Sequence, residues 1–188
     1  MEPLRNTIIY LLGPPGVGKY TVGKLISEQT GARLLHNHYW SNIILNLVHQ
    51  DGITPLPLEV WARTEEVRRA VFSTVENLSP PDWSFVITHA AAGEPDDIDH
   101  AIISDVSRLA ASRGARLCSF SLKCSREELV ERVQSPERAT MMKDRNPETA
   151  HEHALLSPLD PGIGHHVAID TSGLDAETVA DRIIQSLF

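Results

Sequence analysis

The chain has 188 residues and is acidic, with 17 lysines and arginines against 25 aspartates and glutamates. A solvated acidic surface argues against general binding to nucleic acid or to a membrane surface, and no apolar run approaches the ~20 residues of a membrane-spanning helix. The two cysteines, Cys118 and Cys124, lack the CxxC spacing of a metal or redox site. We therefore expect one cytoplasmic domain over residues 1–188 that binds neither nucleic acid nor membrane.

Short apolar runs alternate with longer amphipathic stretches, which predicts an α/β fold with a parallel sheet. The expected strands are residues 7–12, 32–35, 84–88, 116–122 and 166–170. The expected helices are residues 18–30, 97–113, 176–187, one beginning near 125, and two pieces within 39–78 separated at the prolines of 51–57. Five strands with helices between them predict a three-layer, doubly wound, five-stranded parallel sheet.

A glycine-rich loop follows the first expected strand. Its sequence Gly13-Pro14-Pro15-Gly16-Val17-Gly18-Lys19 has the GxxxxGK spacing and opens a helix, the context that this motif requires. Glycines let the backbone curl so that several amides point at phosphate oxygens, and the helix N-terminus adds partial positive charge. The lysine supplies a full charge for the β- and γ-phosphates. The motif predicts an ATP-binding loop formed by Gly13, Pro14, Pro15, Gly16, Val17, Gly18, Lys19, Tyr20 and Thr21.

The expected Mg²⁺ site departs from the usual pattern of such loops. Tyr20 stands directly after the lysine, where a serine or threonine hydroxyl is usual, and Thr21 follows it. The third expected strand ends in Thr88 and His89 and carries no carboxylate that could hold the ion through water. We expect Mg²⁺ as a cofactor, with Thr21 as the ligand from the loop.

At this point the chain resembles the P-loop small-molecule kinases, namely the shikimate and gluconate kinases and, more distantly, adenylate kinase. The loop carries the resemblance together with a basic stretch from Arg132 to Arg145 and the segment 169–174. The resemblance implies a mobile lid at about residues 133–148. It also implies that Arg138 closes over the transferring phosphate and that Arg132 lies near the adenine and phosphates.

The same resemblance implies that Asp170 and Thr171 frame the nucleobase. For all of these residues, a solvated basic loop or a simple turn at the end of a strand is the alternative interpretation.

The resemblance places the acceptor site near the end of the second strand and in the helices at about residues 38–78. Shikimate kinases usually carry Asp-x-Asp there, whereas this chain has His36-Asn37-His38. Either histidine could take a hydroxyl proton near neutral pH, or both could orient a phosphate or a polar substrate. Arg63 or Arg68 could pair with an anionic acceptor, although an exposed salt bridge fits the sequence equally well.

These observations lead to one main hypothesis and two alternatives. The main hypothesis is an ATP-dependent phosphotransferase that moves the γ-phosphate to a small-molecule acceptor, as a monomer or homodimer. The first alternative is a nucleotide-binding switch or degenerate kinase without turnover, which Tyr20 and the missing acid favour. The second is a nucleoside triphosphate hydrolase, for which the sequence offers no evident carboxylate to activate water. The acceptor itself cannot be identified from the sequence.

Overall fold

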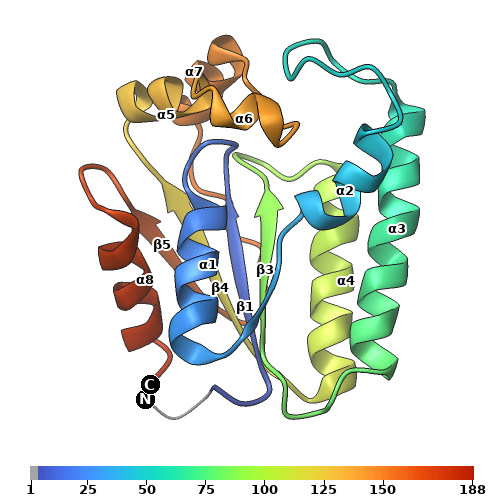
Figure 1. Cartoon of the computed structure of the whole chain (residues 1–188). Helices are drawn as coiled ribbons and strands as arrows, with labels where there is room; N and C mark the ends of the chain where they lie inside the picture. Colours follow the sequence, from blue (N-terminus) through green and yellow to red (C-terminus); the bar gives the residue numbers. More distant parts are fainter. Residues whose placement is uncertain (1–3) are drawn as a thin grey trace.

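A computed structural model describes residues 4–188 and shows a five-stranded sheet in the order β2-β3-β1-β4-β5. All of the pairings are parallel, which confirms the predicted doubly wound α/β class. The strands are β1 (Thr7–Gly13), β2 (Arg33–Leu35), β3 (Phe85–Ala90), β4 (Arg116–Lys123) and β5 (His165–Asp170). Figure 1 shows the sheet between two layers of helices.

The helices agree with the predicted alternation, including the two pieces on either side of the proline-containing break. They are α1 (Lys19–Thr30), α2 (His38–Leu45), α3 (Leu58–Asn77), α4 (Asp97–Arg113), α5 (Arg126–Val133), α6 (Glu137–Thr140), α7 (Pro147–Leu155) and α8 (Ala176–Gln185). In residues 4–188, none of them combines the length and the apolarity needed to cross a membrane.

The central strand β1 explains how the two helical layers pack. All seven of its residues are buried, and successive side chains point to opposite faces of the sheet. Ile9 and Leu11 join the core formed with α1, α5 and α8. Tyr10 and Leu12 join the core formed with α3 and α4. A strand buried on both faces needs a continuous apolar run, which is why the sequence predicted β1 so clearly.

The region 135–147 is more regular than its polar sequence suggested. It contains the short helix α6, and Asn146 caps α7 by accepting a hydrogen bond from the amide of Glu148. In Figure 1, α5, α6 and α7 lie above the carboxyl ends of the strands, opposite α2 and the loop that follows it. β1 and β4 are neighbours in the sheet. The chain leaves β1 toward β2, on one side, and leaves β4 toward β5, on the other, so these two connections diverge at this edge. Ligands of doubly wound sheets bind where connections diverge in this way.

Candidate nucleotide and acceptor site

At two positions, the end of β1 and the loop that follows it have a backbone conformation and close contacts that only glycine permits. Gly13 has φ of +142°, and a Cβ there would lie 2.4 Å from the carbonyl oxygen of Leu122. Gly16 has φ of +94°, and its Cβ would lie 2.7 Å from a side-chain carbon of Val133. The curled loop leads into α1. The N-cap residue of this helix, Gly18, has no side chain that could accept hydrogen bonds from the amides of the first turn. Those amides are therefore available to bind an anion.

Lys19 lies inside this curl. Its side-chain nitrogen Nζ donates hydrogen bonds to the carbonyl oxygens of Gly13, at 2.5 Å, and Pro14, at 2.8 Å. Burial, followed by the nearby charges of Arg138 and Lys143, lowers the pKa of Lys19 to about 7. Cations that lie close together lower one another's pKa values, and a bound polyanion would stabilise their charged forms. The loop, the lysine and the open helix end therefore fit a nucleotide polyphosphate.

The loop opens into a cavity of about 1170 Å³. Most residues predicted for the site line it, namely Pro15, Gly16, Val17, Gly18, Lys19, Tyr20, Thr21, His36, His38, Arg132, Arg138 and Thr171. Gly13 and Pro14 contribute through the carbonyls that hold Lys19. Asp170 does not reach the cavity, because its carboxylate is exposed and bonds to Ser172 and Lys123.

His36 is fixed in one tautomer by the end of β3. The Thr88 hydroxyl donates its only hydrogen to Asn37 Oδ1 at 3.1 Å and accepts from the Asn37 amide at 3.0 Å. His36 Nδ1, 2.9 Å from the same oxygen, must therefore be the donor. Its Nε2 is then a bare acceptor, buried without a partner among residues 4–188. Burial, followed by the charges of His38, Lys143 and Lys19, lowers the pKa of His36 to about 2.

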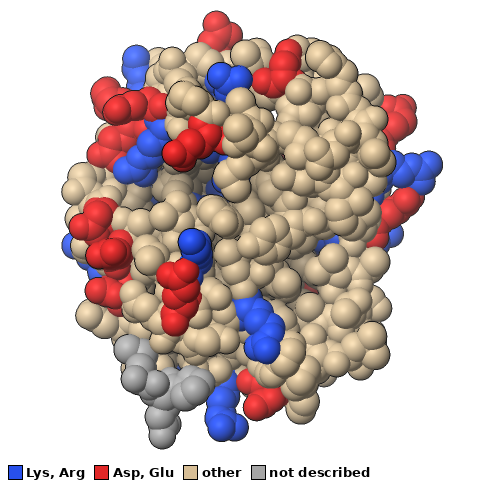
Figure 2. Space-filling view, in the orientation of Figure 1, with Lys and Arg blue, Asp and Glu red and all other residues tan. Residues whose placement is uncertain are grey.

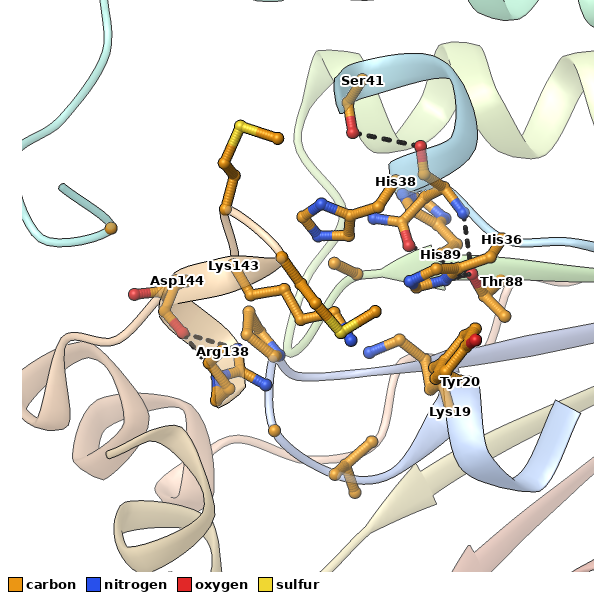
Figure 3. A pocket seen from close by; sticks show the side chains of 18 of the residues that line it. Lys19, Tyr20, His36, His38, Ser41, Thr88, His89, Arg138, Lys143 and Asp144 are labelled. Atoms are coloured by element: carbon orange, nitrogen blue, oxygen red, sulfur yellow. Dashed lines mark hydrogen bonds between the residues drawn. The ribbon is translucent and has the colours of Figure 1, made fainter. Parts of the chain in front are cut away.

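His38 is held in the same way by its own helix. Asn42 donates through its side-chain nitrogen to the carbonyl of Met141 at 3.3 Å, so its oxygen faces His38 Nδ1 at 2.8 Å. His38 Nδ1 is thus the donor, and Nε2 keeps its lone pair. Burial lowers the pKa of His38 to about 4, although the bond to Asn42 opposes the shift. In Figure 3, the imidazoles of His36 and His38 lie on one side of the cavity with Lys19 close to His36, and Arg138 lies on the other side.

The segment predicted as a lid brings basic side chains to the cavity. Arg138 donates from Nε and Nη2 to the carbonyl oxygen of Asp144, at 2.8 and 2.6 Å, which fixes its guanidinium. The Lys143 ammonium lies 4.8 Å from the centroid of the Tyr20 ring. Arg132 bonds to Glu128 at 2.7 Å and lies against the carbonyl of Val17 at 3.4 Å, beside the loop.

The lid segment also contacts the opposite wall of the cavity. The Arg145 amide donates to the carbonyl of Gly52 at 2.7 Å, between α2 and α3. Asn42 makes a second link through its bond to Met141. Two hydrogen bonds therefore link the lid segment to the wall formed by α2 and the loop that follows it, across the cavity.

Tyr20 points toward the histidines, since its ring centroid lies 4.8 Å from that of His36. Thr21 is exposed and lines the cavity. Within residues 4–188, no group of three or more His, Cys, Asp or Glu side chains is arranged to hold a metal ion. Mg²⁺ that keeps most of its waters and binds chiefly to phosphates would fit such a site. The role of Thr21 as its protein ligand stays a prediction.

The structure supplies a carboxylate beside β3 that the sequence did not reveal. Asp99, in the first turn of α4, lies 2.9 Å from His89 Nε2, and His89 Nδ1 lies 2.5 Å from the Tyr10 hydroxyl. Asp99 also forms a reciprocal capping box with Asp96. The pattern Asp96-x-x-Asp99 signals a helix start, but only the fold places that start against the end of β3.

No family model and no curated protein sequence matches the chain. Several solved structures share its fold. A protein from Chloroflexus aurantiacus, whose assignment as a kinase is provisional, superposes with a TM-score of 0.66 at 16% identity, covering 98% of each chain. A gluconokinase from Sinorhizobium meliloti gives 0.57 at 19%, covering 99% of this chain and 97% of the other. The Deinococcus radiodurans tunicamycin resistance protein gives 0.60 at 19%, covering 97% and 96%.

These likenesses cover almost the whole chain, which has the fold of the P-loop small-molecule kinases. The expected resemblance is confirmed at the level of the fold. The proteins that share this fold range from a gluconokinase to a tunicamycin resistance protein, so the fold does not determine the acceptor.

Proposed function

We propose that this protein is an ATP-dependent phosphotransferase that moves the γ-phosphate to a hydroxyl of a small molecule. The observation that carries the proposal is one cavity with Lys19 and its loop at one wall and the unprotonated Nε2 of His38 at another. Phosphoryl transfer depends on positioning and on offsetting charge, and this cavity brings together the groups for both. The kinase fold of the chain supports the same conclusion.

In the proposed reaction, the loop amides and Lys19 bind the phosphates of ATP, and Arg138 offsets charge on the transferring group. Arg132 and Thr171 border the nucleobase, and Thr21 together with the phosphates would hold Mg²⁺, which would offset charge on the phosphates. His38 Nε2 takes the hydroxyl proton while the acceptor oxygen bonds to the γ-phosphorus. The bond from that phosphorus to the bridging oxygen breaks, and ADP leaves with its electron pair.

The same observations allow one other function, a nucleotide-binding switch or degenerate kinase without turnover. Tyr20 favours it, because its ring takes the place of the usual magnesium-binding hydroxyl and packs on His36. The fixed guanidinium of Arg138 and the neutral histidines favour the kinase, because a protein that only binds nucleotide has less need of them.

The test is ADP release from ATP and Mg²⁺ across a panel of hydroxylated acceptors, with Lys19→Ala as the control. A kinase releases ADP only with its acceptor, and the variant abolishes this release. Tight ATP binding without release for any acceptor would favour the switch, and absence of nucleotide binding would overturn both functions.

A further inference from the structure

The part of the cavity beyond His38 has an unusually apolar wall. We call it the acceptor end, formed by α2, residues 46–57 and the first turns of α3 and α4. Four large apolar side chains line it although they are well exposed, namely Ile53 (55%), Leu58 (76%), Trp61 (40%) and Ile98 (49%). Large apolar side chains left uncovered around a hollow are characteristic of ligand contacts.

The chain around the acceptor end carries few charges. Asp51 is the single Asp, Glu, Lys or Arg in residues 38–58. Figure 2 shows a correspondingly broad uncharged surface over α2 and the loop that follows it. In the described lining of the acceptor end, the charged side chains come from α3 and the start of α4. They include the carboxylates of Glu65, which bonds to Arg69, of the helix cap Asp96, and of Asp99, which faces His89.

Arg68 is the basic residue of the described acceptor-end lining, and it is paired with two carboxylates that it shares with neighbouring arginines: Asp105 with Arg108, and Glu65 with Arg69. Its side chain is 3% exposed; Nη1 donates to Asp105 at 2.7 Å, and Nη2 lies 3.6 Å from Glu65. The other cations of the described cavity lining are Lys19, Arg132, Arg138 and Lys143, and they lie around the phosphate-binding loop and Tyr20, on the near side of His38. A negative group carried beyond His38 would therefore meet carboxylates and no unpaired cation of the described lining, which is unfavourable in a partly desolvated site.

Arg68 nevertheless has hydrogen-bonding capacity to spare. Its Nη2 is buried and has no hydrogen-bond partner among residues 4–188. A buried donor without a partner is costly, so a ligand oxygen that reached it would be bound well. Because the carboxylates of Asp105 and Glu65 already lie beside the guanidinium, an uncharged oxygen suits this donor better than a further carboxylate does.

We propose that the acceptor is an alcohol with a bulky apolar body, an uncharged oxygen for Arg68 and no negative charge. The inference rests on the proposed phosphotransferase function and names its substrate class. The apolar body lies against Trp61 and its neighbours, and the reacting hydroxyl is presented to His38. A neutral or amine-bearing alcohol meets these requirements, whereas a sugar acid or other hydroxy acid does not.

The experiment compares matched acceptors, namely aryl-substituted diols and their hydroxy-acid counterparts, with gluconate and shikimate added. Binding to the ADP complex is measured by calorimetry, and phosphate transfer by ADP release. The proposal expects neutral aryl diols to bind at least tenfold more tightly than the matched acids. Lys19-dependent release with the acids alone would overturn this substrate class but support the kinase. Binding of the diols without release for any alcohol would support the substrate class and contradict the kinase.

Two variants test the wall and the charge separately. Trp61→Ala is expected to weaken diol binding on the order of tenfold, from the loss of apolar burial, while ATP binding is unchanged; Leu78→Ala, at the exposed end of α3, is the control. Asp96→Asn keeps a good helix cap and is expected to narrow the preference for diols over acids by about fivefold. Asp97→Asn, on the same helix turn outside the cavity lining, should leave the preference unchanged. Unaltered binding in both cavity variants, or stronger binding of the acids to the unmodified protein, would overturn the proposal.

Discussion

Lys19 is expected to take up a proton when nucleotide binds at mildly alkaline pH. In the nucleotide-free protein, burial and then the charges of Arg138 and Lys143 lower its pKa from 10.5 to about 7. Bound phosphates are anionic and stabilise the ammonium, so they raise this pKa again. Above pH 7 the free protein therefore holds Lys19 mostly neutral, whereas the complex holds it charged. Binding must then bring one proton from solution.

The size of the effect follows from linkage. Between the free and bound pKa values, a one-proton uptake weakens binding tenfold for each unit of pH. The Kd for ATP is expected to rise about tenfold from pH 7.5 to pH 8.5, above the pKa of ~6 at which phosphate monoesters complete their ionisation. Below pH 7, Lys19 is charged in both states, and this dependence disappears.

Isothermal titration calorimetry at pH 8, in buffers of different ionisation enthalpy, measures the proton uptake directly. The unmodified protein is expected to take up about 0.9 proton, the neutral fraction of a group with a pKa near 7. Lys19→Arg provides the control, because its cation does not titrate in this range. A Kd that is independent of pH, or equal uptake by the arginine variant, would refute the reasoning.

Three further predictions concern the cavity and its loop. Arg138→Met is expected to lower kcat about 10²- to 10³-fold by removing a charge-offsetting donor, whereas Arg126→Met, at an exposed position of α5, leaves it unchanged; steady-state kinetics distinguish them. His38→Ala is expected to lower kcat about 10²-fold or more, and because the pKa of His38 lies near 4, the unmodified protein should show no histidine limb between pH 5 and 7. Gly13→Ala should lower the free energy of unfolding by about 3 kcal/mol or more, through strain and the clash with β4, but Gly173→Ala, with no atom near its Cβ, by about 1 kcal/mol; urea denaturation measures both.

The sequence predicted the features that depend on neighbouring residues. β1 and its loop were readable because a buried strand and a glycine-dependent turn each leave a local pattern, and Lys19 follows from its spacing. The paired helices α2 and α3 were readable because prolines interrupt a helical pattern. The histidines were noticed because they stand where the resembling family carries acids.

Contacts between distant segments could not be predicted in the same way. Arg68 was considered as a partner for an anionic acceptor or for a surface ion pair, yet the structure buries it against Asp105, 37 positions away. Asp99 meets His89 because α4 begins over the end of β3, a relation that no local spacing records. Thr171 and Asp170 are neighbours in the sequence, but successive residues of an extended chain point in opposite directions, and only Thr171 faces the cavity.

The most direct test of the central claim follows the γ-phosphate itself. ATP labelled at that group is incubated with Mg²⁺, the protein and each acceptor, and the products are separated. The account predicts label in an acceptor phosphate ester, with none in the Lys19→Ala reaction. Label that accumulates only as inorganic phosphate, at a rate independent of every acceptor, would contradict it and identify a hydrolase.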